Sequence, residues 1–162
     1  MIPLELVGVR VEVPANTPML LLREVDGRQR LIPVYIGTAE ATAIHYALEG
    51  IEPPRPLTHD LFMQTLTELG VTLERVVVTE VRDHTFFAEL HLHRPDGTLL
   101  GVSSRTSDAL ALAVRCGAAM VAADELVDTV GQEAEAEPEE QAEEIIDEFR
   151  DFIEQVNPED FG

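Results

Sequence analysis

The sequence predicts an α+β fold, with helices packed on a mixed or antiparallel sheet that arises by internal duplication of a β-β-β-α unit. Three runs, residues 4–13, 19–25 and 30–36, have the apolar content and turn signals of strands. A helical pattern follows at residues 38–49. The same succession of patterns then returns from residue 71 onward.

The first three strands are predicted from alternation and from turn residues. Residues 4–13 alternate in polarity around Gly8, which favours a β-bulge there. The two runs that follow flank Asp26-Gly27, a dipeptide typical of β-hairpins. Pro33 lies inside the third run and cannot donate to a sheet ladder, so we expect that run at an edge.

Two helices are predicted next. In residues 38–49 the apolar side chains recur at helical spacing, with Thr38 as the expected N-cap and Gly50 as the stop. After a proline-rich loop, residues 59–69 form a second amphipathic run, for which Thr58 is the expected N-cap.

The second half repeats this order. The expected elements are strands 71–82, 85–93 and 98–104, a helix 107–116, a short strand 119–122 and a final turn or helix from Asp124.

The chain also resembles itself at an offset of 68 residues. When residues 9–44 are placed on 77–112 without a gap, ten of 36 pairs are identical, where about two or three are expected from ordinary residue frequencies. We therefore predict two repeat units, about 4–50 and 72–117, with helix 59–69 inserted between them. The alternative is that two amphipathic units of one class resemble each other by chance.

Charge divides the chain into a domain, residues 1–130, and a tail. The 162 residues have a net charge of −20. Residues 1–131 hold 18 acidic residues and 10 arginines, a net −8, and the remaining residues contribute −12. Such a domain lacks the overall basic character of nucleic-acid binders, although a local arginine cluster would suffice.

The acidic end is predicted to have two parts. Residues 131–144 form a charged, low-complexity linker. Residues 145–157 place apolar side chains at helical spacing on an acidic background, which predicts an amphipathic helix. A helix this short is marginal alone in water, so we expect it to dock on this domain, on a second subunit or on a protein partner.

Other features of composition exclude several classes of protein. One cysteine, Cys116, rules out an intramolecular disulfide and a multi-cysteine zinc site, and its apolar surroundings predict a buried side chain. The first residues lack the basic region of a signal peptide, and no run of about 18 apolar residues suggests a membrane span. We therefore expect a cytoplasmic location.

Two acids occupy matching places in the repeat. With Thr38 and Thr106 as expected caps, Glu40 and Asp108 fall in the first turn of their helices. A first-turn acid stabilises a helix by about 0.3–1 kcal/mol through the dipole, which would explain both. Alternatively, the duplication brings two carboxylates to a shared site, where they could bind a divalent metal through oxygen.

Residues 54–61, PRPLTHDL, hold more chemical groups than a linker needs. Arg55 has a guanidinium suited to phosphate, and Thr58, His59 and Asp60 open a helix whose N-terminus favours anions. His59 is a candidate general base or metal ligand, and Asp60 could orient it. The structural alternative is that Asp60 complements the helix dipole and that Arg55 pairs with a nearby glutamate.

One further strand face combines an acid with two histidines. Glu89, His91 and His93 alternate with apolar residues. This pattern is typical of the solvent-exposed face of an antiparallel strand, and less often of a transition-metal site.

At these motifs the chain resembles the bifunctional nuclease family of bacteria and plants. The resemblance covers about residues 1–130 and rests on four segments: IGTAEATAIHYALEG (36–50), PRPLTHDL (54–61), TFFAEL (85–90) and SRTSDALALAVR (104–115). It implies an α+β fold, a homo-oligomer (a dimer or larger) and DNase and RNase activity. The chain departs from the family pattern at Thr106, where proline is usual, and at His84, where glycine is usual.

The resemblance and the acid-and-arginine set together suggest a metal-assisted nuclease that hydrolyses single-stranded DNA or RNA. In this hypothesis Glu40, Asp60 and Asp108 would hold Mg²⁺ or Mn²⁺, and His59 would activate water. The substrate-binding candidates are the side chains that can donate hydrogen bonds to phosphate: Arg55, Thr58, Arg105 and Ser107.

Two alternatives remain open. The first is a non-catalytic homo-oligomeric regulatory or interaction module, in which the same residues serve as caps and ion pairs and the acidic tail binds a partner. The second is an enzyme acting on another anionic small molecule, bound by the arginines.

Overall fold

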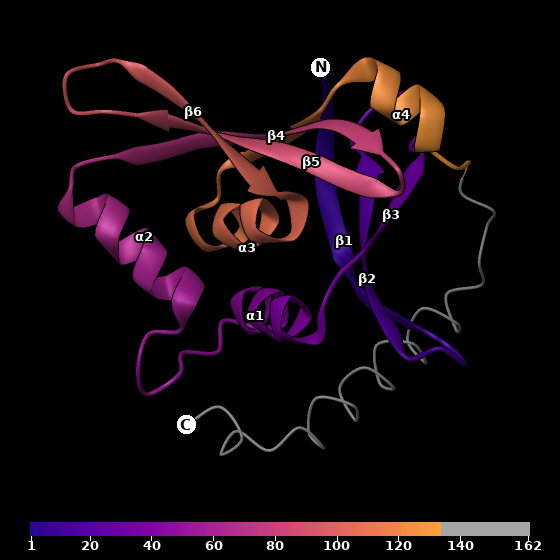
Figure 1. Ribbon diagram of the computed structural model, residues 1–162, viewed down its shortest axis with the longest axis horizontal. Coiled ribbons are helices and arrows are strands. Elements are labelled where there is room, and N and C mark those ends of the chain that lie inside the picture. The colour runs from indigo at the N-terminus through magenta and orange to yellow at the C-terminus, as the bar shows by residue number, and fades with distance from the viewer. Residues whose placement is uncertain (134–162) are drawn as a thin grey trace.

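The computed structural model describes residues 1–133 as one seven-stranded sheet with four helices (Figure 1). The elements in chain order are β1 (Ile2–Glu12), β2 (Thr17–Glu24), β3 (Leu31–Tyr35), α1 (Thr38–Leu48), α2 (Thr58–Glu68), β4 (Thr72–Arg82), β5 (Thr85–His93), β6 (Leu99–Arg105), α3 (Thr106–Cys116), β7 (Ala119–Ala122) and α4 (Asp124–Val130). The predicted α+β class is confirmed, and the predicted bounds differ from these by at most two residues.

The sheet is mixed, with the order β3-β2-β1-β7-β4-β5-β6. Two antiparallel meanders, β1 to β3 and β4 to β6, form its two sides. The short strand β7 joins them, antiparallel to β1 and parallel to β4. One continuous sheet therefore carries both halves of the chain.

The turn and bulge predictions are confirmed. The register of β1 against β2 shifts between Leu6 and Gly8, as expected for a bulge. Pro33 lies in β3, which is an edge strand of the sheet, so its missing N–H removes no interior ladder bond. Gly27, in the turn between β2 and β3, has φ of 75°, a conformation that glycine adopts without strain.

The helices α1 and α3 lie next to each other against the sheet, and α3 contacts β4 and β5 (Figure 1). Their packed surfaces and the inner face of the sheet form one core of buried apolar side chains. Among its largest fully buried members are Leu20, Leu22, Ile32, Ile44, Leu110, Val76, Val78 and Val127. Helix α2 packs on α3 and connects the two halves of the chain.

The two halves have the same order of elements, β-β-β-α. Helix α1 and helix α3 each have 11 residues, and both of their ends differ by 68 in number, the offset found in the sequence. This agreement fits a duplication, although the common origin of the two halves stays a prediction.

Each of the three predicted threonine caps is wrong by one residue. The N-caps are Gly37, Leu57 and Arg105, and Thr38, Thr58 and Thr106 are the first helical residues after them. None of the three helices has a side-chain cap from its N-cap residue. The hydroxyl of Thr106 is instead buried and has no hydrogen-bond partner among the described residues.

Two further expectations can be compared with the structure. Cys116 is exposed and not buried, because it is the last residue of α3 and its side chain turns back to the Leu112 carbonyl, 3.3 Å away. In the predicted linker, Gln132 pairs with Leu31 at the sheet edge. The rest of the linker and the tail helix, 145–157, lie outside the described residues. Within residues 1–133, no helix is long and apolar enough to cross a membrane.

Candidate functional site

A histidine and an aspartate from two helices meet at the centre of the candidate site. His59 lies in the first turn of α2, and Asp108 lies in the first turn of α3. The His59 Nε2 atom is 2.9 Å from Asp108 Oδ1. Their side chains are 15% and 29% exposed, so the pair is partly shielded from water yet remains reachable.

Arg105 extends this pair on its other side. Its Nε is 2.6 Å from Asp108 Oδ2, and its Nη2 is 3.0 Å from Oδ1. The same Nη2 is 2.9 Å from Oε1 of Glu40 in α1. The structure therefore brings together four predicted site residues in one connected group, which we call the His59–Asp108–Arg105–Glu40 cluster.

The electrostatics of the cluster keep Asp108 ionised. Burial on its own would raise the pKa of Asp108, but the hydrogen bonds from Arg105 and His59 outweigh this effect and lower its pKa below 3.8. An ionised carboxylate only accepts hydrogen bonds, so His59 must carry its proton on Nε2 to make the 2.9 Å contact. The Nδ1 of a neutral His59 then has a free lone pair.

Gly37 allows Glu40 to reach Arg105. The Glu40 carboxylate turns back over the N-cap of α1, and a Cβ on residue 37 would overlap its Oε2 atom. The backbone of Gly37 is extended, with φ of −78°, a conformation open to any residue. Glycine is therefore needed here for space alone, and composition or spacing gave no signal of this role.

Asp60 points away from the cluster although it is the neighbour of His59. Its Oδ1 is 2.7 Å from Nε of Arg115, near the end of α3, and its Oδ2 accepts a 2.9 Å hydrogen bond from the Leu57 N–H. Burial on its own raises the pKa of Asp60. The hydrogen bonds from Arg115 and Leu57 lower it by more, so the pKa lies below its ordinary value of 3.8. This geometry supports a structural role for Asp60.

The remaining predicted residues lie near the cluster in sequence but are not part of it. Arg55 and Thr58 are exposed, and no side chain of residues 1–133 pairs with Arg55. The nearby glutamates that could have paired with it, Glu49 and Glu52, form no ion pair with it. Ser107 is buried, with 8% exposure, next to Thr106 at the start of α3.

The predicted metal ligands are not gathered into one group. Arg115 binds Asp60, and Arg105 binds both Asp108 and Glu40. Across residues 1–133, no three His, Cys, Asp or Glu side chains are placed to hold a metal ion. The arrangement fits a set of arginine–carboxylate pairs better than a preformed site for Mg²⁺ or Mn²⁺.

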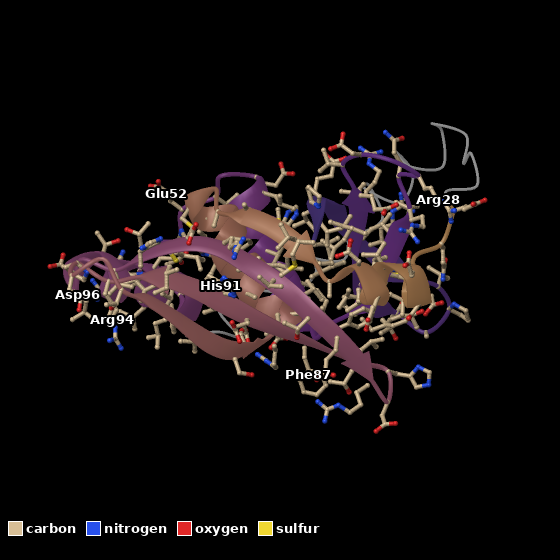
Figure 2. The ribbon with its side chains drawn as sticks, turned by 90° about the horizontal axis from the view of Figure 1, so that it is seen from above. Arg28, Glu52, Phe87, His91, Arg94 and Asp96 are labelled. Carbon is tan, nitrogen blue, oxygen red and sulfur yellow. The ribbon has the colours of Figure 1, made fainter. Side chains whose placement is uncertain are left out.

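The histidine face of β5 is also engaged in pairs. His91 Nε2 is 2.9 Å from Glu89, and His93 is 3.1 Å from Glu74 on β4. Figure 2 shows His91 along β5 between Phe87 and the turn that carries Arg94 and Asp96. Glu89, His91 and His93 are half-buried, which fits a strand face that is partly open to solvent.

The cluster has the parts that proton transfer near an anion requires. Asp108 orients His59, whose Nδ1 can take a proton. Arg105, 67% exposed, makes no hydrogen bond through Nη1 to any described residue. The N–H groups on Nη1 therefore remain able to donate hydrogen bonds to a phosphate or carboxylate.

The chain is similar in sequence to a known protein family and to several known proteins. The bifunctional nuclease domain family matches residues 20–135, most of the chain. An uncharacterised protein of Mycobacterium tuberculosis is 39% identical over 160 residues, which cover 96% of this chain and 94% of that protein.

Plant relatives match a smaller part. Bifunctional nuclease 1 of Arabidopsis thaliana is 27% identical over 104 residues, 63% of this chain and 32% of the plant protein. Bifunctional nuclease 2 of Oryza sativa subsp. japonica is 23% identical over 111 residues, 67% of this chain and 34% of the plant protein. The chain thus spans about a third of each plant protein.

Proposed function

Because the chain belongs to the bifunctional nuclease domain family, we propose that it hydrolyses phosphodiester bonds of single-stranded DNA or RNA at the His59–Asp108–Arg105–Glu40 cluster. The observation that supports this proposal most directly is the 2.9 Å contact of His59 Nε2 with Asp108 Oδ1. The other Asp108 oxygen binds Arg105, so base and anion-binding group are fixed by one carboxylate.

In this proposal each residue has one role. His59 takes a proton from the attacking water through Nδ1 while the bond from phosphorus to the leaving sugar oxygen breaks, and solvent protonates that oxygen. Asp108 holds the ring and stabilises the imidazolium that forms. Arg105 binds a non-bridging phosphate oxygen through Nη1. Glu40 contacts the Nη2 atom of the Arg105 guanidinium and is a positioning residue.

A divalent cation is a separate part of the proposal. A cation such as Mg²⁺ or Mn²⁺ would supply charge stabilisation for the phosphate. Of the predicted ligands, Glu40 and Asp108 share a partner in Arg105, whereas Asp60 is held apart by Arg115. Any metal would therefore have to compete with Arg105 for these carboxylates. Comparing cleavage in Mg²⁺, in Mn²⁺ and in EDTA decides whether one is needed.

The test is a cleavage assay on fluorescent single-stranded DNA and RNA with the variants His59→Ala and Asp108→Asn. General acid–base catalysis contributes about 10²–10⁴-fold to rates, and we expect losses of that order in both variants. The matched control is His93→Ala, which removes a partly exposed histidine of β5 outside the cluster and should leave the rate unchanged. Cleavage by His59→Ala at the wild-type rate would contradict the proposal.

The second candidate is a non-catalytic interaction module, a homo-oligomer with an acidic tail that binds a partner. It is favoured by the arginine partner of every predicted catalytic carboxylate, since such ion pairs also serve structure alone. This candidate predicts no cleavage under any metal condition, together with a loss of thermal stability in Asp108→Asn as large as in Asp60→Asn.

A further inference from the structure

A pocket lies directly beside the cluster and shares Arg105 with it. Its volume is about 340 Å³, within the range of small-molecule sites. Its walls come from the end of β3, the start of α1, the turn between β4 and β5, and the start of α3. Four segments that are distant in the sequence therefore enclose one space.

Two helices begin at this pocket, and neither has a side-chain cap. Gly37 is the N-cap of α1, Arg105 is the N-cap of α3, and both residues line the pocket. The first N–H groups of a helix have no partner within the helix and carry partial positive charge. Glu40 and Asp108 lie in the first turns of the same helices and bond Arg105, so an anion such as phosphate would be held here by the helix N–H groups and by Arg105 Nη1.

Thr106 is an independent indication that this pocket takes a ligand. It lines the pocket, it is 2% exposed, and its Oγ1 finds no hydrogen-bond partner among the described residues. Buried hydroxyl groups nearly always have a partner. An acceptor atom of a bound molecule would supply one.

The other end of the pocket is lined by rings. Tyr35 is 56% exposed at the end of β3, His84 is exposed in the β4–β5 turn, and Phe86 follows on β5. Figure 2 places the next residue, Phe87, far along β5 from the turn that carries Arg94 and Asp96. Tyr35 and His84 expose their rings and Phe86 is half-buried, and aromatic rings at a surface are groups on which nucleic-acid bases stack.

The backbone at His84 strengthens this assignment. Asp83 and His84 have φ of 49° and 61°, in the left-handed region that favours glycine. Glycine would adopt this conformation with less strain than histidine does. Strained residues of this kind gather at functional sites.

We infer that this pocket binds one unpaired nucleotide of the substrate. Its phosphate would lie at the starts of α1 and α3 beside Arg105, and its base would stack among Tyr35, His84 and Phe86. The inference rests on the proposed function and deepens it. A base held in a duplex cannot enter such a pocket without leaving its stack, so the pocket selects single strands.

Calorimetric titration of the full chain tests this inference with three probes: deoxythymidine monophosphate, thymidine and inorganic phosphate. We expect the nucleotide to bind at least ten-fold more tightly than either part. Base stacking predicts that Tyr35→Ala weakens nucleotide binding by about ten-fold. Tyr35→Phe keeps the ring and should bind like the wild type. Because Tyr35 is largely exposed, both variants should fold.

Thr106→Val examines the phosphate end. The substitution replaces an unpaired buried hydroxyl by a methyl group of similar shape, so the melting temperature should stay equal or rise. Nucleotide binding should weaken several-fold. A fall in melting temperature with unchanged binding would show that the hydroxyl serves the fold, and would overturn its assignment to the ligand.

The remaining outcomes separate this inference from the proposed function. Deoxythymidine monophosphate has no phosphodiester bond, so its binding is independent of cleavage, and His59→Ala should bind it normally. Equal affinity for phosphate and nucleotide, with no effect of Tyr35→Ala, would overturn the inference, as would no binding at all. Nucleotide binding without cleavage of any nucleic acid would contradict only the proposed function.

Discussion

At the scale of single residues, Arg105 connects all the groups of the candidate site. It bonds both oxygens of Asp108, reaches Glu40 and lines the neighbouring pocket. Asp108 and Glu40 raise the pKa of the Arg105 guanidinium, which therefore stays charged at every working pH. A single fixed cation thus serves two carboxylates and still offers Nη1 to a ligand.

Gly37→Ala should damage the site and spare the fold. A Cβ at residue 37 displaces the flexible end of Glu40, which then loses Arg105. The extended backbone accepts alanine, and the substitution reduces the freedom of the unfolded chain, so stability should stay equal or rise by about 0.4–1 kcal/mol. We expect a cleavage rate several-fold below that of the wild type.

Gly50→Ala is the matched control for this variant. Gly50 follows α1 with φ of 65°, and an added Cβ would meet no atom within 4 Å. Alanine there costs about 1 kcal/mol in stability from the left-handed conformation alone. Activity at a temperature where both variants are folded should match the wild type. The reverse pattern, a destabilised Gly37→Ala with full activity, would contradict the role given to Glu40.

At the scale of elements, two side-chain contacts hold α2 against α3. In one of them α3 supplies the carboxylate, and in the other α2 supplies it. His59 meets Asp108 at the start of α3, and Asp60 meets Arg115 at its end. Arg115 also donates to the carbonyl of Ala43, 3.0 Å away in α1. Because Asp60 and Arg115 hold three helices together, they fix the position of the helix start that carries His59.

Asp60→Asn should therefore destabilise the fold. Arg115 has a side chain only 10% exposed and would lose its charged partner, which costs about 1–3 kcal/mol. The folded pKa of Asp60 lies below the ordinary 3.8, so its contribution is fully present above pH 3.8 and is lost as pH falls through the folded pKa. Urea unfolding should show a difference between variant and wild type at neutral pH that shrinks below pH 3.8. A constant difference would contradict the ion pair.

Local patterns predicted the elements well, because alternation, turn dipeptides and helix stops act over a few residues. The Asp26-Gly27 hairpin, the Gly8 bulge and the edge position of Pro33 all follow from short-range chemistry. The place of β7 between β1 and β4 could not be predicted, because strand order depends on pairing between distant segments.

The sequence pointed to the members of the candidate cluster but not to their pairings. His59, Arg105, Asp108 and Glu40 stood out by residue type, yet 49 residues separate His59 from Asp108, and only the packing of α2 on α3 brings them together. The same packing turns Asp60 the other way. Neighbouring side chains on a helix point in different directions, so sequence adjacency alone suggested a joint role that the geometry does not support.

At the scale of the whole molecule, the chain places one exposed arginine, Arg105, beside two carboxylates on a strongly acidic protein. Residues 1–131 carry −8 of the net −20, and the remainder carries −12. Nucleic acid is itself highly negative, so long-range repulsion opposes its approach at low ionic strength. Substrate binding would then depend on local contacts at Arg105 and the pocket.

Reducing the acidic charge should strengthen substrate binding in a salt-dependent way. Residues 133–144 contain seven glutamates, and changing them all to glutamine alters the net charge from −20 to −13. At low salt the variant should bind single-stranded DNA several-fold more tightly than the wild type, as measured by fluorescence anisotropy. The screening length is about 10 Å at 0.1 M salt and about 3 Å at 1 M, so the difference should disappear as salt rises. If the difference persists at high salt, the glutamates make short-range contacts. If the variant binds more weakly than the wild type, the acidic segment assists the substrate and does not repel it.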